Sequence, residues 1–303
     1  MPYSHVRGAF GLLRRFDVGL VAAVRPWQLG EVAELVRAAA GEGVPLSLWP
    51  MLADEDGRWA NARNAPAFGA FVRALCDVLD AARARVGEIA LDVEPPIADV
   101  RALLGEAGRR EGVKASLRAV RDGMRGAGAA YGELVAELGA RGVRASAALV
   151  PLSLAGGRWH RMMGWPEREA AVEHLSVMLY TSILEGWSRG VFDRQDARAL
   201  LARGCSSAVR RLGARAGASL GAVGTGALGN EPVYRGVDEL ADDVAVARAA
   251  GLDDLALFDL GGVLRRPPPE AWLEAFVATE PAAELPKPST RVRAAVFLAR
   301  LSR

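Results

Sequence analysis

One stretch of this sequence determines the fold prediction: Glu88-Ile-Ala-Leu-Asp-Val-Glu-Pro-Pro96. A short apolar run here carries two carboxylates, Asp92 and Glu94, and ends on two prolines. Proline has no N–H to donate to a strand ladder, so the strand must stop before Pro95. Residues i and i+2 of a strand project from the same face, which places both carboxylates together at the strand's carboxyl end. In parallel α/β barrels this is the end that holds the active site.

Six further runs of strand length occur along the chain, and amphipathic helical stretches separate them. The other expected strands are Val18–Val24, Pro45–Met51, Arg144–Val150, Leu175–Thr181, Ala218–Gly224 and Leu255–Leu260. The clearest expected helices are Leu29–Ala40, Ala67–Arg85, Asp196–Leu212, Asp238–Ala250 and Pro269–Ala278. Near-continuous apolar strands that alternate with helices predict a parallel sheet covered by helices on its outer face.

An open doubly wound sheet and a closed barrel both satisfy this alternation. The glycine fingerprint G-x-G-x-x-G of the dinucleotide-binding open sheet does not follow the first strand. Strands spread from Val18 to Leu260 fit a barrel, whose typical length is roughly 250 residues. We therefore predict an α/β fold of the (β/α)8 TIM barrel class. Its missing first strand falls within Ser4–Leu13, or this segment is helical and the barrel is incomplete.

The predicted barrel occupies residues 1–280 and includes a helical excursion over residues 97–142, which holds more residues than one connection needs. Beyond Glu280, three prolines (Pro281, Pro286 and Pro288) predict a linker. The remaining residues of segment 281–303 include a basic amphipathic helix, Thr290–Leu301, which we expect to pack on the barrel exterior.

Composition excludes several classes of protein. The chain has 303 residues, 51% of them apolar and 24% charged, which is typical of a globular protein. Its 38 basic and 36 acidic residues leave a net charge near +2, and without a basic face we expect no nucleic-acid partner. No apolar run approaches the roughly 20 residues that span a bilayer, so we expect a soluble protein with no membrane partner. No signal peptide is evident, which favours the cytoplasm, or secretion if a signal has been removed.

The counts of lysine, histidine and cysteine limit the chemistry further. Only Lys114 and Lys287 occur, one in a charged helical stretch and one in the proline-rich tail, so Schiff-base chemistry is not expected. The three histidines form no pair at helical spacing, and Cys76 and Cys205 stand far apart. We therefore predict no metal site, no disulfide framework and no cofactor.

The pair Asp92 and Glu94 suggests acid–base chemistry. If both point inward, each loses hydration at a cost of several kcal/mol unless partners or a proton compensate. One of them should then titrate high. A raised carboxyl beside an ionised one is the arrangement that supplies a general acid for glycosidic cleavage. The alternative is a pair of rim carboxylates that cap a helix or bind arginine.

The motif Asp92-x-Glu94 resembles the last half of the D-x-x-D-x-D-x-E signature of family 18 glycoside hydrolases, the chitinases and endo-β-N-acetylglucosaminidases. Farther along, Met178-Leu-Tyr180-Thr181 resembles that family's Met-x-Tyr-Asp motif. The resemblance implies that Glu94 protonates the leaving oxygen and that Asp92 orients the substrate's acetamido group as internal nucleophile. The hydroxyl of Tyr180 would support that group.

Three positions depart from the family pattern. Gly87 and Ala90 stand where the signature has its first and middle aspartates, and Thr181 replaces the aspartate of the second motif. A short Asp-x-Glu motif after an apolar strand also occurs in family 25 lysozymes. The motifs therefore specify a glycosidase-like barrel better than they specify one family.

Aromatic residues at predicted strand ends favour a carbohydrate substrate, because sugar rings present apolar C–H faces and polar rims. The predicted substrate-binding residues are Trp27, Trp49, Trp59, Trp187, Met178, Asp54 and Asp259. Asn61 and Asn64 lie on the same predicted rim as Asp54, and either bind hydroxyls or solvate a loop. A tryptophan at such a position also serves as ordinary core.

Two other functions compete with hydrolysis. The glycine-rich segment Gly221–Asn230 follows the penultimate strand, where many barrels bind phosphate with backbone amides, as a lyase or isomerase of sugar phosphates would. A barrel that binds glycans without catalysis is the second alternative, and Ala90 is its best argument. Sequence leaves the oligomeric state open.

Overall fold

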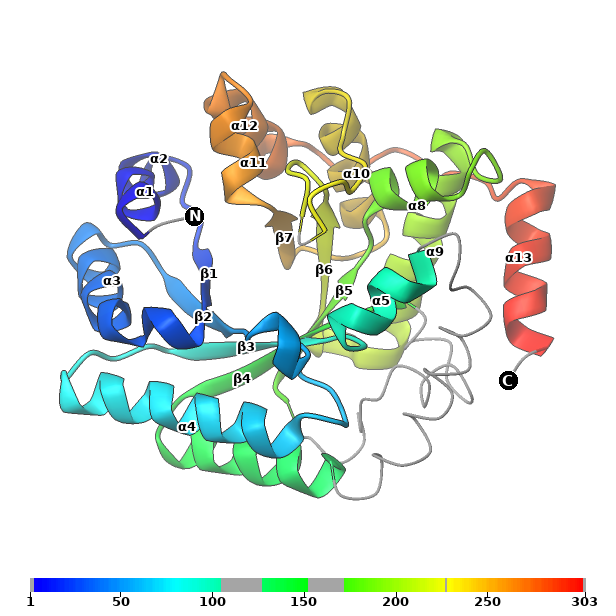
Figure 1. Cartoon of the computed structure of the whole chain (residues 1–303). Helices are drawn as coiled ribbons and strands as arrows, with labels where there is room; N and C mark the ends of the chain where they lie inside the picture. Colours follow the sequence, from blue (N-terminus) through cyan, green and yellow to red (C-terminus); the bar gives the residue numbers. More distant parts are fainter. Residues whose placement is uncertain (1–2, 105–126, 152–171, 227, 302–303) are drawn as a thin grey trace. The chain divides into compact units, whose positions relative to one another are not determined.

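The computed structural model describes residues 3–104, 127–151, 172–226 and 228–301. Its sheet contains seven strands in the order in which they follow one another along the chain (Figure 1). They are β1 (Leu20–Val24), β2 (Leu46–Pro50), β3 (Glu88–Val93), β4 (Arg144–Leu149), β5 (His174–Met178), β6 (Ala216–Gly221) and β7 (Leu255–Phe258). The pairs β1–β2, β2–β3, β5–β6 and β6–β7 are parallel. The predicted fold class, α/β with the strand order of a (β/α)8 barrel, is confirmed.

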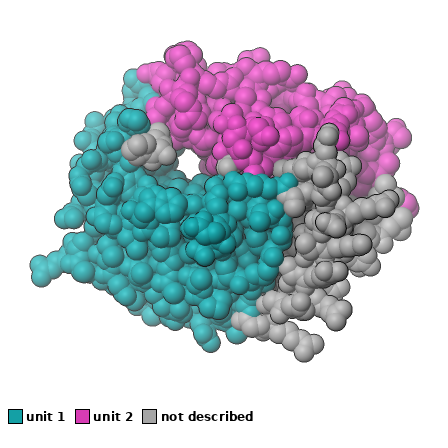
Figure 2. Space-filling model, in the orientation of Figure 1, with its two compact units in different colours: residues 1–148, 158–173 teal, residues 149–157, 174–303 magenta. Residues whose placement is uncertain are grey.

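The chain divides into two compact units (Figure 2). Unit 1 consists of Met1–Ala148 with Arg158–Glu173, and unit 2 of Leu149–Gly157 with His174–Arg303. The single barrel domain predicted for residues 1–280 stays a prediction.

In unit 1, two helices cover the sheet, α3 (Leu29–Glu42) and α4 (Ala65–Ala81). Helix α3 ends at Gly43, which adopts the left-handed conformation (φ +71°) that favours glycine after a helix. The apolar faces of both helices are buried. One face of the sheet is buried as well, and its side chains include Ala22, Leu48, Ile89 and Leu91. Their burial supplies the hydrophobic free energy that holds this half of the sheet.

The segment Ser4–Leu13, for which the sequence left a strand and a helix open, contains no strand. Two short helices occupy the segment, α1 (Tyr3–Gly8) and α2 (Phe10–Arg15). Tyr3, Val6, Phe10 and Leu13 recur at helical spacing, and all four are buried. The helical alternative given with the prediction is the one that holds.

The excursion over residues 97–142 begins with α5 (Ile97–Leu104), and residues 127–140 are helical. Residues 105–126 lie outside the described part of the chain. Helix α5 starts at Ile97, so only Pro95 and Pro96 separate it from Glu94. Helix α5 therefore lies in sequence directly beside the predicted carboxylate pair.

Unit 2 contains β5, β6 and β7 with the helices α8 (Thr181–Trp187), α9 (Arg194–Leu212), α10 (Val237–Ala249), α11 (Leu260–Arg265) and α12 (Pro269–Ala278). Helix α9 starts in a capping box, in which the Asp193 carboxylate accepts the Asp196 N–H at 2.9 Å. Helix α13 (Thr290–Leu301) packs on α9, with Val292 buried and Arg291 paired with Asp193 at 2.7 Å.

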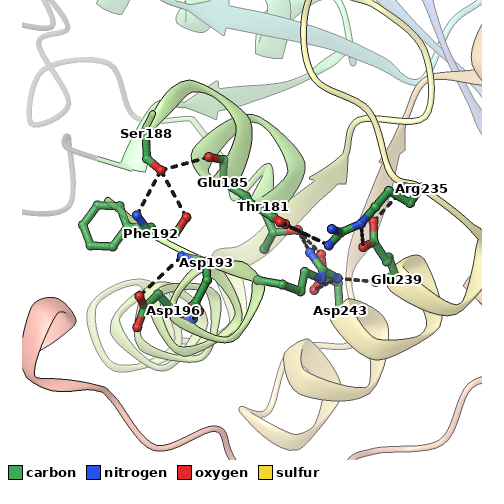
Figure 3. A network of polar contacts seen from close by, with 10 residues as sticks. Thr181, Glu185, Ser188, Phe192, Asp193, Asp196, Arg235, Glu239 and Asp243 are labelled. Carbon is green, nitrogen blue, oxygen red and sulfur yellow. Dashed lines mark hydrogen bonds and ion pairs between the residues drawn. The ribbon is translucent and has the colours of Figure 1, made fainter. Parts of the chain in front are cut away.

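A buried polar network joins the helices of unit 2 (Figure 3). Asp243 on α10 is fully buried and accepts hydrogen bonds from the hydroxyls of Thr181 and of Tyr234, the second at 2.8 Å. Its other oxygen pairs with Nη2 of Arg194 at 2.7 Å. Arg194 also donates to the Thr181 hydroxyl at 2.5 Å. The starts of α8 and α9 are thereby fixed to α10.

Burial raises the pKa of Asp243 to about 6, although the positive charge of Arg194 and the hydrogen bonds oppose this rise. Removal of such a carboxylate leaves a buried guanidinium without its counter-charge. We expect Asp243→Ala to lower the free energy of unfolding by about 3–5 kcal/mol in urea denaturation. Asp242→Ala is the matched control, because that side chain is half exposed and its pair with Arg198 is 3.4 Å long. Its loss should cost at most about 1 kcal/mol, and similar losses for both variants would contradict a structural role for the network.

Candidate functional site

The carboxyl end of β3 carries the candidate site of unit 1. Along this strand Ile89, Leu91 and Val93 are fully buried on one face, against the helices. Asp92 and Glu94 therefore share the opposite face, as the spacing predicts. The backbone N–H of Ala60 donates to the Asp92 carbonyl at 2.9 Å, so the loop after β2 is anchored to the end of β3.

Asp92 and Glu94 are neighbouring carboxyl groups that differ in exposure. Asp92 is 3% exposed, whereas Glu94 is half-buried. Burial raises the pKa of Asp92 to about 7, against the opposing effects of Glu94, Trp49 and the positive charge of Arg58. The raised pKa favours the protonated form of Asp92 at pH values where an exposed carboxylic acid is ionised. Glu94 is the member of the pair that reaches solvent.

The three tryptophans predicted in unit 1 have different environments. Trp49 is half-buried and acts on the pKa of Asp92, so it belongs to the carboxyl pair's surroundings. Trp59 is only 4% exposed, with the Arg58 guanidinium 5.7 Å from its ring centroid. It offers no open face for a sugar, and its assignment as a substrate-binding residue is corrected to a packing role. Trp27 is 67% exposed, more than any other large apolar side chain of the described residues.

Asp54 was predicted to bind substrate, but its carboxylate is already engaged. Arg58 binds it with two hydrogen bonds of 2.8 and 2.9 Å, Arg25 binds it at 3.0 Å, and Arg101 binds it at 3.2 Å. Hydrogen bonds and positive charge from Arg58, and to a smaller extent from Arg25, lower the pKa of Asp54 to about 2. Asp54 therefore orders three arginines and is no free acceptor for sugar hydroxyls.

The amides of Asn61 and Asn64 build the loop after β2. Asn61 Nδ2 and Asn64 Nδ2 both donate to the Trp59 carbonyl at 2.8 Å. The hydroxyl of Tyr131 donates to the Asn61 carbonyl at 3.1 Å. Both asparagines are buried, so they hold the loop and do not bind a ligand.

In unit 2 the predicted residues Met178 and Tyr180 lie at the end of β5. Met178 is buried, and the half-buried Tyr180 ring stacks on Phe258 at the end of β7, with centroids 5.4 Å apart. Glycine at position 221 permits this packing, because a Cβ there would stand 3.1 Å from the Tyr180 ring. Sequence reasoning missed Phe258, although it directly precedes the predicted Asp259 at a strand end.

Asp259 and Trp187 were both predicted as substrate contacts. The Asp259 carboxylate caps α11 and accepts the Gly262 N–H at 2.7 Å. Its assignment is corrected to a helix cap, because this bond satisfies an otherwise unpaired amide of the first turn. Trp187 is half-buried as the last residue of α8, and its role as a sugar contact stays a prediction.

Thr181, which stands where the resembled motif has an aspartate, belongs to the buried network of unit 2. Its hydroxyl is 2% exposed and connects Asp243 with Arg194 in the buried network of unit 2. An aspartate at this position would face the Asp243 carboxylate, and the like charges would repel each other. Position 181 therefore serves the packing of α8 and not a ligand.

The glycine-rich loop after β6 contains a carboxylate of its own. Glu231 accepts the N–H of Leu228 at 3.1 Å, and a Cβ at Gly226 would overlap the Glu231 side chain. A phosphate near Gly226 would thus meet a negative charge in place of free amides. This observation weighs against the sugar-phosphate alternative.

Other predicted features lie elsewhere or outside the described residues. Trp159, His160 and Trp165 fall on residues 152–171, outside the described part of the chain. Cys76 and Cys205 are free and buried. Within the described ranges, no group of three His, Cys, Asp or Glu side chains is placed to hold a metal ion. No helix among the described residues has the length and apolar character to cross a membrane.

Known proteins resemble this chain in fold. No protein-family model and no curated protein sequence matches it. The PgaB (BpsB) glycoside hydrolase domain from Bordetella bronchiseptica is 9% identical with a TM-score of 0.48, over 80% of this chain and 78% of that one. A D-allulose 3-epimerase from Methylomonas sp. is 16% identical with a TM-score of 0.44, over 85% and 79%. A GH113 β-1,4-mannanase is 14% identical with a TM-score of 0.44, over 99% and 93%. Similarity this distant concerns the fold and says nothing about activity.

The raised pKa of Asp92 predicts a pH-dependent penalty on stability. As pH rises from about 4 to about 7, the unfolded chain releases the Asp92 proton while the folded chain keeps it, so stability falls. Asp92→Asn mimics the protonated acid and removes the penalty. We expect it to raise the free energy of unfolding at pH 8 by on the order of 2 kcal/mol, with the gain vanishing toward pH 4.

Thermal unfolding between pH 4 and pH 8 measures this difference. Asp54→Asn is the matched control with the opposite sign, since the pKa of Asp54 is lowered and its ionised form stabilises the fold at neutral pH. A gain for Asp92→Asn that is equal at all pH values, or a loss at pH 8, would show that Asp92 is ionised in the folded protein.

Proposed function

We propose that this protein is a glycoside hydrolase that cleaves a β-linked, N-acetylated sugar, with Glu94 as the general acid. The observation that carries the proposal is the position of the buried Asp92 beside the half-buried Glu94 at the carboxyl end of β3. General acid catalysis at neutral pH requires a carboxyl group that stays protonated there. Burial supplies this condition, and the half-buried Glu94 is the member able to pass the proton to a bound glycan.

The first step would break the bond between the anomeric carbon and the leaving oxygen. Glu94 gives its proton to that oxygen, and the substrate's acetamido oxygen attacks the anomeric carbon to form a cyclic oxazolinium ion. In the second step the Glu94 carboxylate removes a proton from water, whose oxygen adds to the anomeric carbon and opens the ring. The acid is thereby regenerated, and the sugar keeps its anomeric configuration.

Asp92 would serve both steps through its position beside Glu94. Before cleavage the buried Asp92 passes its proton to the neighbouring Glu94, which delivers it to the leaving oxygen. Once that proton has left, the Asp92 carboxyl is free to bind the acetamido N–H and to balance the positive charge of the oxazolinium ion. The supporting role of the Tyr180 hydroxyl remains a prediction from the family resemblance, and loss of activity in Tyr180→Phe would test it.

Glu94→Gln removes the acid without changing the shape of the side chain. We expect hydrolysis of an aryl β-N-acetylglucosaminide or of a chitooligosaccharide to fall by about 10²–10⁴-fold, with little change in melting temperature. Glu88→Gln is the matched control at the other end of the same strand, where Glu88 binds Ser146 at 2.6 Å and Arg144 at 2.7 Å. Turnover that survives in Glu94→Gln would eliminate the assignment.

Participation of the acetamido group makes the reaction depend on the substrate's 2-substituent. We expect an aryl β-glucoside, which lacks that group, to react at least about 10²-fold more slowly than the aryl β-N-acetylglucosaminide. Comparison of kcat/KM for the two substrates measures the effect. Equal rates would refute internal nucleophilic attack and leave a hydrolase of another mechanism.

A glycan-binding protein without catalysis is the second candidate, and Ala90 favours it because the signature's middle carboxylate is missing there. It predicts saturable binding of chitooligosaccharides by the wild-type protein with no cleavage products after prolonged incubation. An isomerase that acts on a non-phosphorylated sugar would instead convert it into a different sugar of the same mass, without hydrolysis.

A further inference from the structure

Three guanidinium groups meet at one carboxylate on the rim of unit 1. Arg25 follows β1, Arg58 lies in the loop after β2, and Arg101 lies on α5, yet all three bind Asp54 within 3.2 Å. We refer to these four residues as the arginine cluster. Three positive charges face one negative charge, so the cluster has an excess of two. The side chains of Arg25 and Arg58 are only 14% and 15% exposed, which holds their charges in place.

An open aromatic ring adjoins this cluster. The Arg25 guanidinium stacks on Trp27 at 4.7 Å from the ring centroid and at the same time binds Asp54 at 3.0 Å. Because Arg25 touches both groups, the ring stands next to the excess positive charge. Trp27 is nevertheless 67% exposed. A ring that is fixed by a cation and open to solvent matches the apolar face of a sugar.

The arginine cluster is connected to the carboxyl pair at both ends. Arg101 is on α5, which begins three residues after Glu94. Arg58 is two residues from Ala60, whose N–H donates to the Asp92 carbonyl, and its charge acts on Asp92. The cluster and the carboxyl pair therefore belong to one rim within unit 1.

We propose that Trp27 and the arginine cluster bind an acidic sugar, a uronate, in the glycan that the carboxyl pair cleaves. The sugar stacks on the open ring, and its carboxylate pairs with the half-exposed Arg101. The inference rests on the proposed function and names its substrate class. Guanidinium groups suit this ligand because they bind carboxylates in a planar, bidentate geometry. A neutral glycan would leave the excess charge without a partner.

Glu55 and Asp56 follow Asp54 in the chain and are exposed. Their negative charge lies on the solvent side of the loop, where water and salt screen it more than the half-buried cluster. They weaken the attraction for an acidic sugar. Removal of these charges in the double variant Glu55→Gln and Asp56→Asn should therefore raise the affinity for such a sugar.

The test uses two probes that differ only in charge, a hyaluronan tetrasaccharide and its methyl ester. Both contain β-linked N-acetylglucosamine, but only the first has ionised uronates. Binding is measured by calorimetry at low salt with full-length Glu94→Gln, which prevents cleavage. We expect the acid to bind at least about tenfold more tightly than the ester. In the added background of Arg101→Gln this preference should fall to about threefold or less, and Trp27→Ala should weaken both probes.

Arg63→Gln is the control for general electrostatic attraction. Arg63 is a half-exposed arginine of the same unit that pairs with Asp99 on α5 and is not part of the cluster. It should leave the preference for the acid intact. Equal affinities for acid and ester would overturn the inference, and so would an identical loss in Arg63→Gln and Arg101→Gln.

Failure of this inference and failure of the proposed function give different results. If wild-type protein hydrolyses chitooligosaccharides but Glu94→Gln shows no preference for the acid, the substrate class is wrong and the reaction stands. If the preference depends on Arg101 but no glycan is cleaved, the acidic-sugar site stands on a binding protein without catalysis.

Discussion

The burial of Asp92 beside Glu94 is the constraint on which the candidate site depends. It raises the pKa of Asp92 to about 7 and so favours the protonated acid near neutral pH. The prolines that end β3 locate both groups at the strand end, and the loop after β2 hydrogen-bonds to the Asp92 carbonyl. A more exposed Asp92 would ionise as an ordinary surface carboxylate does, and the pair would lose its acid. The sequence therefore sets the position of Asp92, this position buries the carboxyl group, and burial raises its pKa.

Unit 2 shows the opposite use of a buried carboxylate. Asp243 is as deeply buried as Asp92, but a guanidinium and two hydroxyls satisfy it, and no oxygen remains for a ligand. Its pKa is raised as well. A raised pKa alone thus does not identify a functional group. The two cases differ in their neighbours: Asp92 lies beside the half-buried acid Glu94, whereas both oxygens of Asp243 are bound by side chains of the scaffold.

Much of the fold could be predicted from the sequence, because strand and helix periods are local properties. Strand β3 (Glu88–Val93) ends before Pro95, as predicted, because the two prolines cannot continue a strand ladder. The sequence left a strand or a helix open for Ser4–Leu13, and the helical spacing of its apolar residues agrees with the helices found there. The carboxylate pair was predicted for the same local reason. The contacts of Asp54 and Asp259 could not be predicted from the sequence. Asp54 pairs with Arg101, which is 47 residues away in the chain, and Asp259 caps α11, so both contacts depend on the folded chain.

The pKa values of two acids in unit 1, Asp54 and Asp92, are shifted in opposite directions. Arg58 and Arg25 lower the pKa of Asp54 to about 2, while burial raises the pKa of Asp92 to about 7. Arg58 contributes to both, because it binds Asp54 directly and acts on Asp92 through its charge. Without the Asp54 carboxylate, the arginines would repel one another and the uncompensated charge of Arg58 would favour ionisation of Asp92. Asp54 therefore holds the positive charge together and reduces its effect on the acid pair. The rim of unit 1 can therefore contain a protonated acid and, beside it, a positively charged surface for an acidic sugar.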